Sequence, residues 1–377
     1  MPSRWIHDPT DLGALAERLA ATPEVALDTE GDSLHHYPER LALVQIAVPG
    51  GEVWLVDPLA VADLAPLGAV FASPTVTVVL HAGDNDLAHL KRRHGLRFAS
   101  VFDTSIAARF LGAPATGLDV LLQTYLGVSP PPSRQKDDWS ARPLSEAQLR
   151  YAEADVLHLG ELRRRLTEEL RRVGRLAWVE EECSALAAQP VAERPVAPNA
   201  FAGLRGAREL PLRGLAVLRE LHALRERLAL AADRPPFKIA GDETLVRLAQ
   251  MLPADRAALA GIPGCTPKVI GRWGDALLAA VARGLALPED ALPVLERPPR
   301  ARIPGAATRR IETLRRWRAG VVEQAGLEPG LLLPNRLITA IALAAPRDLE
   351  ALAVVDGVRR WRTEAFGREI VAALAAV

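Results

Sequence analysis

The sequence is poor in cysteine and in long uncharged runs. Its 377 residues include two cysteines, Cys183 and Cys265, too few for a disulfide framework or a cysteine-based zinc site. The longest uncharged run, residues 64–83, is interrupted by prolines and predicts a helix and a strand, not a membrane span. The first 24 residues are studded with charge and lack the apolar core of a signal peptide. These absences favour a globular protein of the reducing cytoplasm with no membrane partner.

Charge is balanced overall but not along the chain. The 46 basic residues equal the 46 acidic residues in number, yet residues 1–204 hold 19 basic and 27 acidic residues, whereas residues 205–377 hold 27 and 19. The two halves therefore carry formal charges of −8 and +8. This split suggests a cation-requiring site in the first half and an anionic partner for the second. Solvated surfaces of either sign are common, so the split carries little weight alone.

Short apolar runs alternate with helical patterns in the first half. The predicted strands are 25–30, 41–48, 53–56 and 76–80, and the predicted helices are 84–94, 104–111 and 118–126. A Pro-rich loop follows, and Ser145 then begins a longer helix with Gln148 placed as its capping-box partner. The pattern predicts an α/β domain over residues 1–190, a mixed sheet with helices on its faces.

The second half is helical and internally repeated. Residues 191–210 are rich in Pro, Ala and Gly and predict a linker. Residues 251–264 align with residues 343–357 at an offset of 93, and the stretch from Val217 resembles that from Thr313 at a slightly longer offset. Two repeats are too few for a solenoid. We therefore predict two copies of one small helical domain, 211–293 and 306–377, joined by a linker at 294–305.

Four carboxylates and one tyrosine fall where a metal site would need them. Asp28 and Glu30 lie two residues apart on a predicted strand, so both side chains point to the same face. Asp86 lies in the first turn of the following helix, and Tyr151 and Asp155 are four residues apart on the capped helix. Buried like charges are costly unless something cationic is bound between them.

Each of these residues also has a purely structural interpretation. Asp28 could begin a turn, Asp86 could favour the helix dipole, Tyr151 could lie in the core, and Asp155 could be solvated. Taken one at a time, these interpretations are the better ones. Taken together, three carboxylate-bearing elements in this order are much harder to explain that way.

The motifs around these residues resemble those of a known family. The stretches are ALDTEGDSLHHYPERLALVQIA (26–47), LHAGDNDLAHL (80–90) and DDWSARPLSEAQLRYAEADVLHL (137–159). They resemble the three exonuclease motifs of ribonuclease D, in the branch of the DEDD superfamily that has Tyr in the third motif. The helical repeat resembles the paired HRDC domains of that family. The resemblance covers essentially the whole chain, and Gly31, where the family often has a bulkier residue, removes no ligand.

The resemblance implies a ribonuclease H-like exonuclease domain followed by two all-α HRDC domains. It implies a metal-dependent 3′–5′ exoribonuclease that trims tRNA precursors and other small structured RNAs and releases nucleoside 5′-monophosphates. Two divalent ions, Mg²⁺ or Mn²⁺, would be held by Asp28, Glu30, Asp86 and Asp155. Asp28 would touch both ions, Glu30 and Asp155 would complete the ion that activates water, and Asp86 would support the second. Tyr151 would orient the attacking water, since a phenol is a poor base at neutral pH.

Three further residues are weaker candidates for substrate binding, namely His81, Arg142 and Lys268. The structural alternatives are a satisfied histidine at a strand end, a scaffold residue that locks the loop before the capped helix, and a plain turn between helices. No Gly-x-x-x-x-Gly-Lys-Ser/Thr motif is present, so no helicase motor is expected. RNA is the expected partner of a monomer without an obligatory protein partner. The rival functions are a DNA-directed exonuclease of the same superfamily and a non-catalytic nucleic-acid-binding protein.

Overall fold

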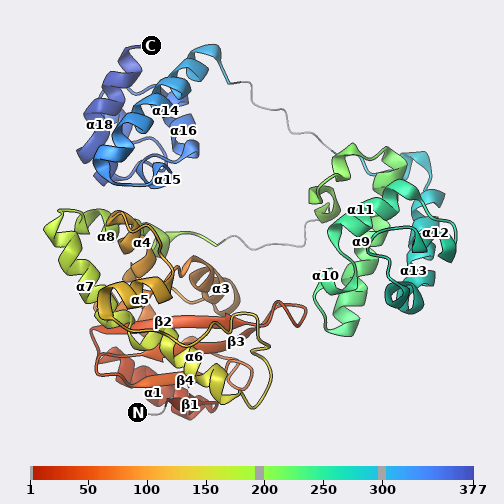
Figure 1. Ribbon diagram of the computed structural model, residues 1–377, viewed down its shortest axis with the longest axis horizontal. Helices are drawn as coiled ribbons and strands as arrows, with labels where there is room; N and C mark the ends of the chain where they lie inside the picture. The colour runs from red at the N-terminus through yellow and green to blue at the C-terminus, as the bar shows by residue number, and fades with distance from the viewer. Residues whose placement is uncertain (1–2, 192–198, 296–302) are drawn as a thin grey trace. The chain divides into compact units, whose positions relative to one another are not determined.

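The computed structural model describes residues 3–191, 199–295 and 303–377. Its first part contains a six-stranded mixed sheet of order β1-β4-β3-β2-β5-β6 (Figure 1). The pair β3·β4 is antiparallel, whereas β1·β4, β2·β5 and β5·β6 are parallel. The predicted α/β domain with a mixed sheet is confirmed. The strands are β1 (Arg4–Ile6), β2 (Glu24–Gly31), β3 (Leu41–Ala47), β4 (Val53–Val56), β5 (Thr77–Leu80) and β6 (Val101–Asp103).

Helices cover both faces of the sheet because alternate strand residues point in opposite directions. In β4, Trp54 and Val56 join one apolar core with helices α1, α2 and α3, while Val53 and Leu55 join another with α6. Figure 1 shows α6 crossing in front of the strands. The helices of this part are α1 (Pro9–Ala20), α2 (Ala65–Phe71), α3 (Asp84–His94), α4 (Thr104–Phe110), α5 (Leu118–Leu126), α6 (Glu146–Leu157), α7 (Leu159–Arg172) and α8 (Leu176–Ala188).

Helix α6 begins at the predicted position, and the loop before it is tightly held. Ser145 accepts from the Gln148 backbone N–H, and the Gln148 side chain accepts from the Ser145 backbone N–H, which completes the predicted capping box. Upstream, the indole of Trp139 is fully buried. The guanidinium of Arg142 donates to both carboxylate oxygens of Asp57 and to three backbone carbonyls. These contacts fix the segment that leads into α6.

The second half consists of two helical copies with one plan. Each helix of the second copy (residues 303–377) begins 93 residues after its counterpart in the first copy (residues 199–295). For example, α9 begins at Leu212 and α14 at Gly305. The offset of 93 holds from the first helix, so the slightly longer offset predicted upstream was wrong. The pairs are α9 (Leu212–Ala232) and α14 (Gly305–Ala325), α10 (Pro236–Ile239) and α15 (Pro329–Leu332), α11 (Asp242–Met251) and α16 (Asn335–Ala344), α12 (Arg256–Ala260) and α17 (Leu349–Ala353), and α13 (Pro267–Ala286) and α18 (Arg360–Ala375).

Each of the two predicted linkers includes residues outside those described, 192–198 and 296–302. The described end of the first linker is not a bare connection. Its short 3₁₀ helices, η1 (Ala200–Gly203) and η2 (Ala207–Glu209), bury Phe201 and Ala207 in the core of the first copy. A third 3₁₀ helix, η3 (Glu289–Ala291), follows α13. No helix in the described ranges is long and apolar enough to cross a membrane.

The described residues divide into two compact units. The first contains residues 3–30, 41–191 and 303–377, so the second copy belongs with the sheet domain. The second contains residues 31–40 and 199–295. Within the first unit, one apolar core includes Phe110 and Val179 of the sheet domain together with Ile338 and Trp361 of the second copy. Within the second unit, His36 Nδ1 lies 2.7 Å from Asp233 Oδ2.

Candidate active site

Parallel strand pairing brings the predicted acidic residues to one edge of the sheet. Strand β2 carries Asp28 and Glu30 near its carboxyl end, and β5 runs parallel beside it. Helix α3 begins four residues after β5 and carries Asp86 in its first turn. The carboxyl ends of parallel strands meet at one edge, so the three acids converge. Helix α6 adds Tyr151 and Asp155 from the face of the sheet that it covers.

A further acid, which the sequence analysis did not single out, shapes the turn before α3. Asp103, at the end of β6, accepts hydrogen bonds from the backbone N–H groups of Ala82 and Gly83 at 3.2 and 2.9 Å. Ala82 has a φ of 51°, a conformation that costs energy for a residue with a Cβ atom. The Asp103 bonds hold this turn in place and thereby position Asp86. A tertiary contact made by a single side chain leaves no periodic signal in the sequence.

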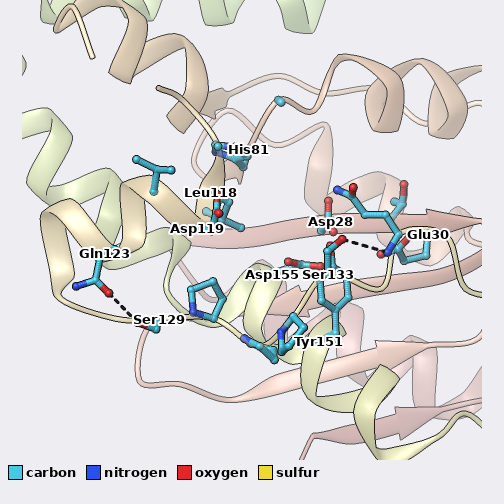
Figure 2. Close-up of a pocket in the computed structure, with 18 of the residues that line it drawn as sticks. Asp28, Glu30, His81, Leu118, Asp119, Gln123, Ser129, Ser133, Tyr151 and Asp155 are labelled. Carbon is cyan, nitrogen blue, oxygen red and sulfur yellow. Dashed lines mark hydrogen bonds between the residues drawn. The ribbon is translucent and has the colours of Figure 1, made fainter. Parts of the chain in front are cut away.

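All five predicted residues line a single cavity of about 980 Å³. One carboxylate oxygen from each of Asp28, Glu30 and Asp155 lies within 4.8 Å of the others. Asp86 accepts a hydrogen bond from the Thr29 hydroxyl. In Figure 2, Asp28, Glu30, Tyr151 and Asp155 gather on one side of the cavity, and His81, Leu118, Asp119 and Gln123 lie on the other.

The surroundings of the four acids disfavour their ionised forms. Burial, together with Asp86, Asp155 and Glu30, raises the pKa of Asp28 well above its ordinary value. Burial and the neighbouring acids raise the pKa of Glu30 to about 8, and burial raises the pKa of Asp155 to about 7. Burial also raises the pKa of Asp86. The described residues that line the cavity include no lysine or arginine to balance these charges.

This set of donors fits hard divalent cations. Carboxylate oxygens are the ligands that Mg²⁺ and Mn²⁺ prefer. No lysine or arginine is among the described residues that line the cavity, and a cation between the acids would favour their ionised forms. The buried oxygens of Asp28, Glu30 and Asp155 lie close enough together to bind one ion jointly. The sequence therefore places a metal-binding donor set at this edge of the sheet.

Tyr151 keeps its proton in this environment. Burial, followed by the charges of Asp155, Glu30 and Asp28, raises the pKa of Tyr151 well above its ordinary value. The side chain of Ser133, which lines the same cavity, offsets part of this rise in the pKa of Tyr151. The Tyr151 ring packs near the indole of Trp139, with 6.0 Å between ring centroids. A protonated phenol can orient a water molecule but cannot deprotonate one.

The weaker substrate-binding candidates fare differently. His81 lines the cavity, but its Nδ1 atom lies 2.9 Å from Thr104 Oγ1. Burial lowers the pKa of His81, so the ring is neutral. Arg142 uses all five of its N–H groups in bonds to the protein and does not line the cavity, which leaves no donor for a phosphate. Lys268 lies exposed in the first turn of α13, in the other unit.

Part of the cavity wall carries no acidic motif and was not predicted as a site. It comprises the first turns of α5 and the Pro-rich loop before Trp139. Val120 on α5 is 40% exposed, an unusual position for a large apolar side chain beside charged groups. The only sequence signal for this wall is the Pro-rich run itself. The lining residues from this region are Gly117, Leu118, Asp119, Val120, Gln123, Thr124, Ser129, Pro130, Pro131, Pro132, Ser133 and Gln135.

Comparison with known families matches both parts of the chain. A family model described as a 3′–5′ exonuclease matches residues 3–171. The HRDC-domain model matches residues 214–281 and 307–374, one match in each helical copy. The exonuclease match contains all four acids and Tyr151.

Relatives of known identity match over almost the whole length. Ribonuclease D from Gluconacetobacter diazotrophicus is 36% identical over 365 residues, 96% of this chain and 90% of the relative. Ribonuclease D from Pseudomonas paraeruginosa is 32% identical over 380 residues, 98% of this chain and 97% of the relative. The crystal structure of Escherichia coli RNase D, described as an exoribonuclease involved in structured RNA processing, has a TM-score of 0.72 and 28% identity, and the match covers 100% of this chain and 99% of that one. The chain therefore belongs to the ribonuclease D family and is a 3′–5′ exoribonuclease with an exonuclease domain followed by two HRDC domains.

Proposed function

We propose that this exoribonuclease trims the 3′ ends of tRNA precursors and other small structured RNAs, and releases nucleoside 5′-monophosphates by two-metal-ion hydrolysis. The observation that carries the proposal is the convergence of Asp28, Glu30 and Asp155 within 4.8 Å in a cavity that Asp86 and Tyr151 also line. The substrate class is supported by the E. coli relative, which is described as acting in structured RNA processing.

Each residue has its own role in the proposed reaction, according to its position in the cavity. Asp28, Glu30, Asp86 and Asp155 would hold two divalent cations, Mg²⁺ or Mn²⁺, and Asp28 would contribute to both. When bound, the cations supply the Lewis acidity that makes a water nucleophilic and stabilises the leaving 3′-oxygen. The Thr29 hydroxyl keeps the Asp86 carboxylate oriented. Tyr151, which stays protonated, orients the attacking water. All of these residues come from one chain, so we expect a monomer to be sufficient.

The two helical copies supply the affinity for long RNA in this proposal. Residues 205–377 carry a formal charge of +8, whereas the half that contains the acidic cavity carries −8. Phosphate contacts provide most non-specific affinity for nucleic acids and make it salt-dependent. The basic half therefore holds the body of the RNA, and the acidic cavity receives only its 3′ end.

The direct test is incubation with 3′-extended tRNA and Mg²⁺ or Mn²⁺, with and without a chelator, followed by chromatography of the released nucleotides. We expect nucleoside 5′-monophosphates in the presence of metal and none with chelator. Asp155→Ala should lower turnover at least about a hundredfold, because even the outer partners of metal ligands contribute ten- to a hundredfold. Glu146→Ala is the matched control, since Glu146 lies on the same helix with its side chain 89% exposed.

Three outcomes would change the conclusion. Equal rates on matched DNA and RNA oligonucleotides would favour a DNA-directed or sugar-blind exonuclease. Binding of RNA without any metal-dependent release would favour a non-catalytic nucleic-acid-binding protein. Substantial turnover by Asp155→Ala would remove the two-metal assignment.

A further inference from the structure

The aromatic site through which the second copy packs on the exonuclease domain has a counterpart in the first copy. In the second copy, the indole of Trp178 from α8 stacks on Trp361 and meets the ring of Phe366 at a steep angle, with 6.1 Å between the centroids of the latter pair. At the offset of 93 residues, the counterparts of Trp361 and Phe366 are Lys268 and Trp273 of α13. The first copy therefore keeps one wall of this aromatic site and has a cation in place of the other.

Trp273 borders a shallow depression in the surface of the first copy. The depression lies where α9, α10 and α13 meet (Figure 1), and most of its lining is apolar, including Leu224, Ile239 and Val269. Its volume is about 10 Å³, which is too small to enclose a ligand, so a ligand would lie flat across it. Among the described residues, no aromatic ring packs on Trp273. An apolar seat with an indole at its edge fits a flat aromatic group.

Three cations stand at the rim of this depression. Each directly precedes a lining residue in the sequence, and the three are Lys238, Lys268 and Arg272. All three are exposed, and among the described residues no carboxylate forms an ion pair with any of them. On α13, Lys268 and Arg272 are four residues apart and share one face of the helix, beside the face that holds Val269 and Trp273. The surface is therefore apolar at its centre and positively charged at its rim.

An unpaired nucleotide of RNA matches both features of this surface. Every nucleobase has a flat face that can stack on an aromatic ring, and its phosphate binds cations. The guanidinium of Arg272 lies 5.0 Å from the centre of the Trp273 ring. Because Arg272 is exposed, its guanidinium can turn to a phosphate when a base takes its place on the ring.

We propose that Trp273 stacks on an unpaired base of the RNA substrate, while Lys268 and Arg272 beside it contact the phosphates of that nucleotide. The inference rests on the proposed function, in which RNA is the substrate. It adds a contact to a base, which attraction between the basic half and the phosphates does not include. RNA with unpaired nucleotides is therefore bound more tightly than a fully paired helix, whose bases are already stacked on one another.

The test measures the binding of fluorescently labelled oligonucleotides to the full-length protein by anisotropy, in an Asp155→Ala background that prevents degradation. The probes are a single-stranded RNA and an abasic oligonucleotide of the same length and charge. Trp273→Leu removes the stacking surface but keeps an apolar side chain. It should weaken binding of the RNA about fivefold to a hundredfold and leave binding of the abasic probe unchanged. Trp273→Phe should restore most of the affinity.

Two further variants separate stacking from charge and from packing. Phe366→Leu, the same kind of change at the counterpart in the second copy, is the matched control and should leave RNA affinity unchanged. Arg272→Ala should reduce the slope of affinity against salt by about 0.7, the loss of one phosphate contact on a single strand. Arg272 is exposed, so this second measurement does not depend on whether the first copy tolerates a change at Trp273. Thermal unfolding of each variant checks that the fold is retained.

Unchanged RNA affinity in Trp273→Leu would overturn the inference. An equal loss on both probes would do the same, because the substitution would then act on the backbone contacts or on the fold and not on a base. An unchanged salt slope in Arg272→Ala would overturn the assignment of the phosphate contact. Self-association that Trp273→Leu abolishes, with RNA affinity unaltered, would assign this face to a second copy of the chain. Failure of the proposed function would appear separately, as no metal-dependent nucleotide release by the unaltered protein, which the binding assay does not measure.

Discussion

The two helical copies share one plan but differ at the start of their last helix. In the first copy, α13 is capped from within, because the Thr266 side chain accepts from the Val269 backbone N–H. The counterpart of Thr266 in the second copy is Arg359, which makes no such cap. There Glu181 of α8 accepts from the backbone N–H groups of Arg360 and Trp361 at 2.7 and 2.9 Å. The exonuclease domain thus supplies the cap of the second copy.

Two residues further along the same helix, the two copies also differ in exposure. Lys268 of the first copy is exposed, whereas its counterpart, Trp361, is buried and stacks on Trp178 of α8 with 4.8 Å between ring centroids. The next residue in the second copy, Arg362, is buried and paired with Glu182 of α8 at 2.9 Å. The start of α13 in the first copy is therefore exposed to solvent. The start of α18 in the second copy is buried against α8 of the exonuclease domain. The two copies thus share the same helices, and different residues at one edge give that edge different surroundings.

The largest expected effect comes from the paired positions themselves. Trp361→Ala should lower the free energy of unfolding of the first unit by about 3–5 kcal/mol, the usual cost of removing a large buried aromatic. Lys268→Ala should change stability by less than about 0.5 kcal/mol, as expected for an exposed surface residue. Urea denaturation of both variants measures the difference. Similar costs at the two positions would contradict the contrast between the copies.

Metal binding and pH give a second test, because the acidic cavity and the second copy lie in the same unit. Glu30 has a pKa raised from 4.5 to about 8, and Asp155 one raised from 3.8 to about 7. Between about pH 4 and pH 8 the metal-free native protein therefore binds more protons than the unfolded chain, so its stability falls as pH rises. Divalent cations need the ionised acids. A Mg²⁺ concentration about one hundred times the Kd measured at pH 8 should stabilise the protein by about 2.7 kcal/mol at pH 8. The same concentration should stabilise it less at pH 6, where fewer acids are ionised and Kd is higher.

Hydrogen exchange followed helix by helix distinguishes the two copies in this experiment. Mg²⁺ should slow exchange in α18 of the second copy and in α8, and should leave α13 of the first copy unchanged. Slowing of equal size in α13 and α18 would show that the copies are not energetically distinct. An Asp155→Ala protein, which lacks one ligand, is the control for binding elsewhere.

The two caps should differ in which part of the protein they stabilise. Glu181→Ala removes the acceptor for two backbone N–H groups and should lower the stability of the first unit by about 1–2 kcal/mol. Thr266→Ala should cost about 1 kcal/mol, confined to the first copy. Exchange rates in α18 and α13 report each effect separately. An effect of Glu181→Ala on α13 would contradict the division into two units.

The smallest effect concerns RNA. In an Asp155→Ala background that prevents degradation, Lys268→Ala should weaken tRNA binding a few-fold and reduce the salt slope by about 0.7–0.9, the loss of one phosphate contact. Arg360→Ala is the control. Arg360 lies in the first turn of the equivalent helix of the second copy, and its charge is already paired with Glu364. Filter binding across a salt series measures both. Equal slopes in the parent and Lys268→Ala would remove Lys268 from the RNA contact.

The sequence predicted which acids lie together at one cavity, because each acid has a recognisable position in a local pattern. Asp28 and Glu30 share a strand face, Asp86 begins a helix, and Asp155 follows Tyr151 by one helical turn. Strands β1 and β6 were not predicted, because three residues each are too few to show a period. The upstream repeat was aligned three residues too far, close to one helical turn. Helices α9 and α14 have apolar and basic residues spaced by turns, so a register shifted by one turn matches almost as well.

The contacts of the second copy and those of the turn before α3 could not be predicted in this way. The pattern of α18 indicates that Trp361 is buried, but it does not say that Trp178 of another domain covers it. The turn before α3 is held by Asp103, which lies about twenty residues further along the chain. Both features depend on tertiary packing between segments far apart in the sequence, which local periodicity does not encode.

The cap and stack between α8 and α18 separate covalent order from physical attachment. The peptide chain reaches the second copy only by passing through the first, yet Glu181 and Trp178 bind the second copy directly to the exonuclease domain. We therefore expect that two fragments produced by a single backbone cut within the first copy stay bound to each other and migrate as one complex in size-exclusion chromatography. We expect the same two fragments, when expressed separately, to associate through the contact between α8 and α18. The enzyme could then be assembled from two chains that are divided within the first copy.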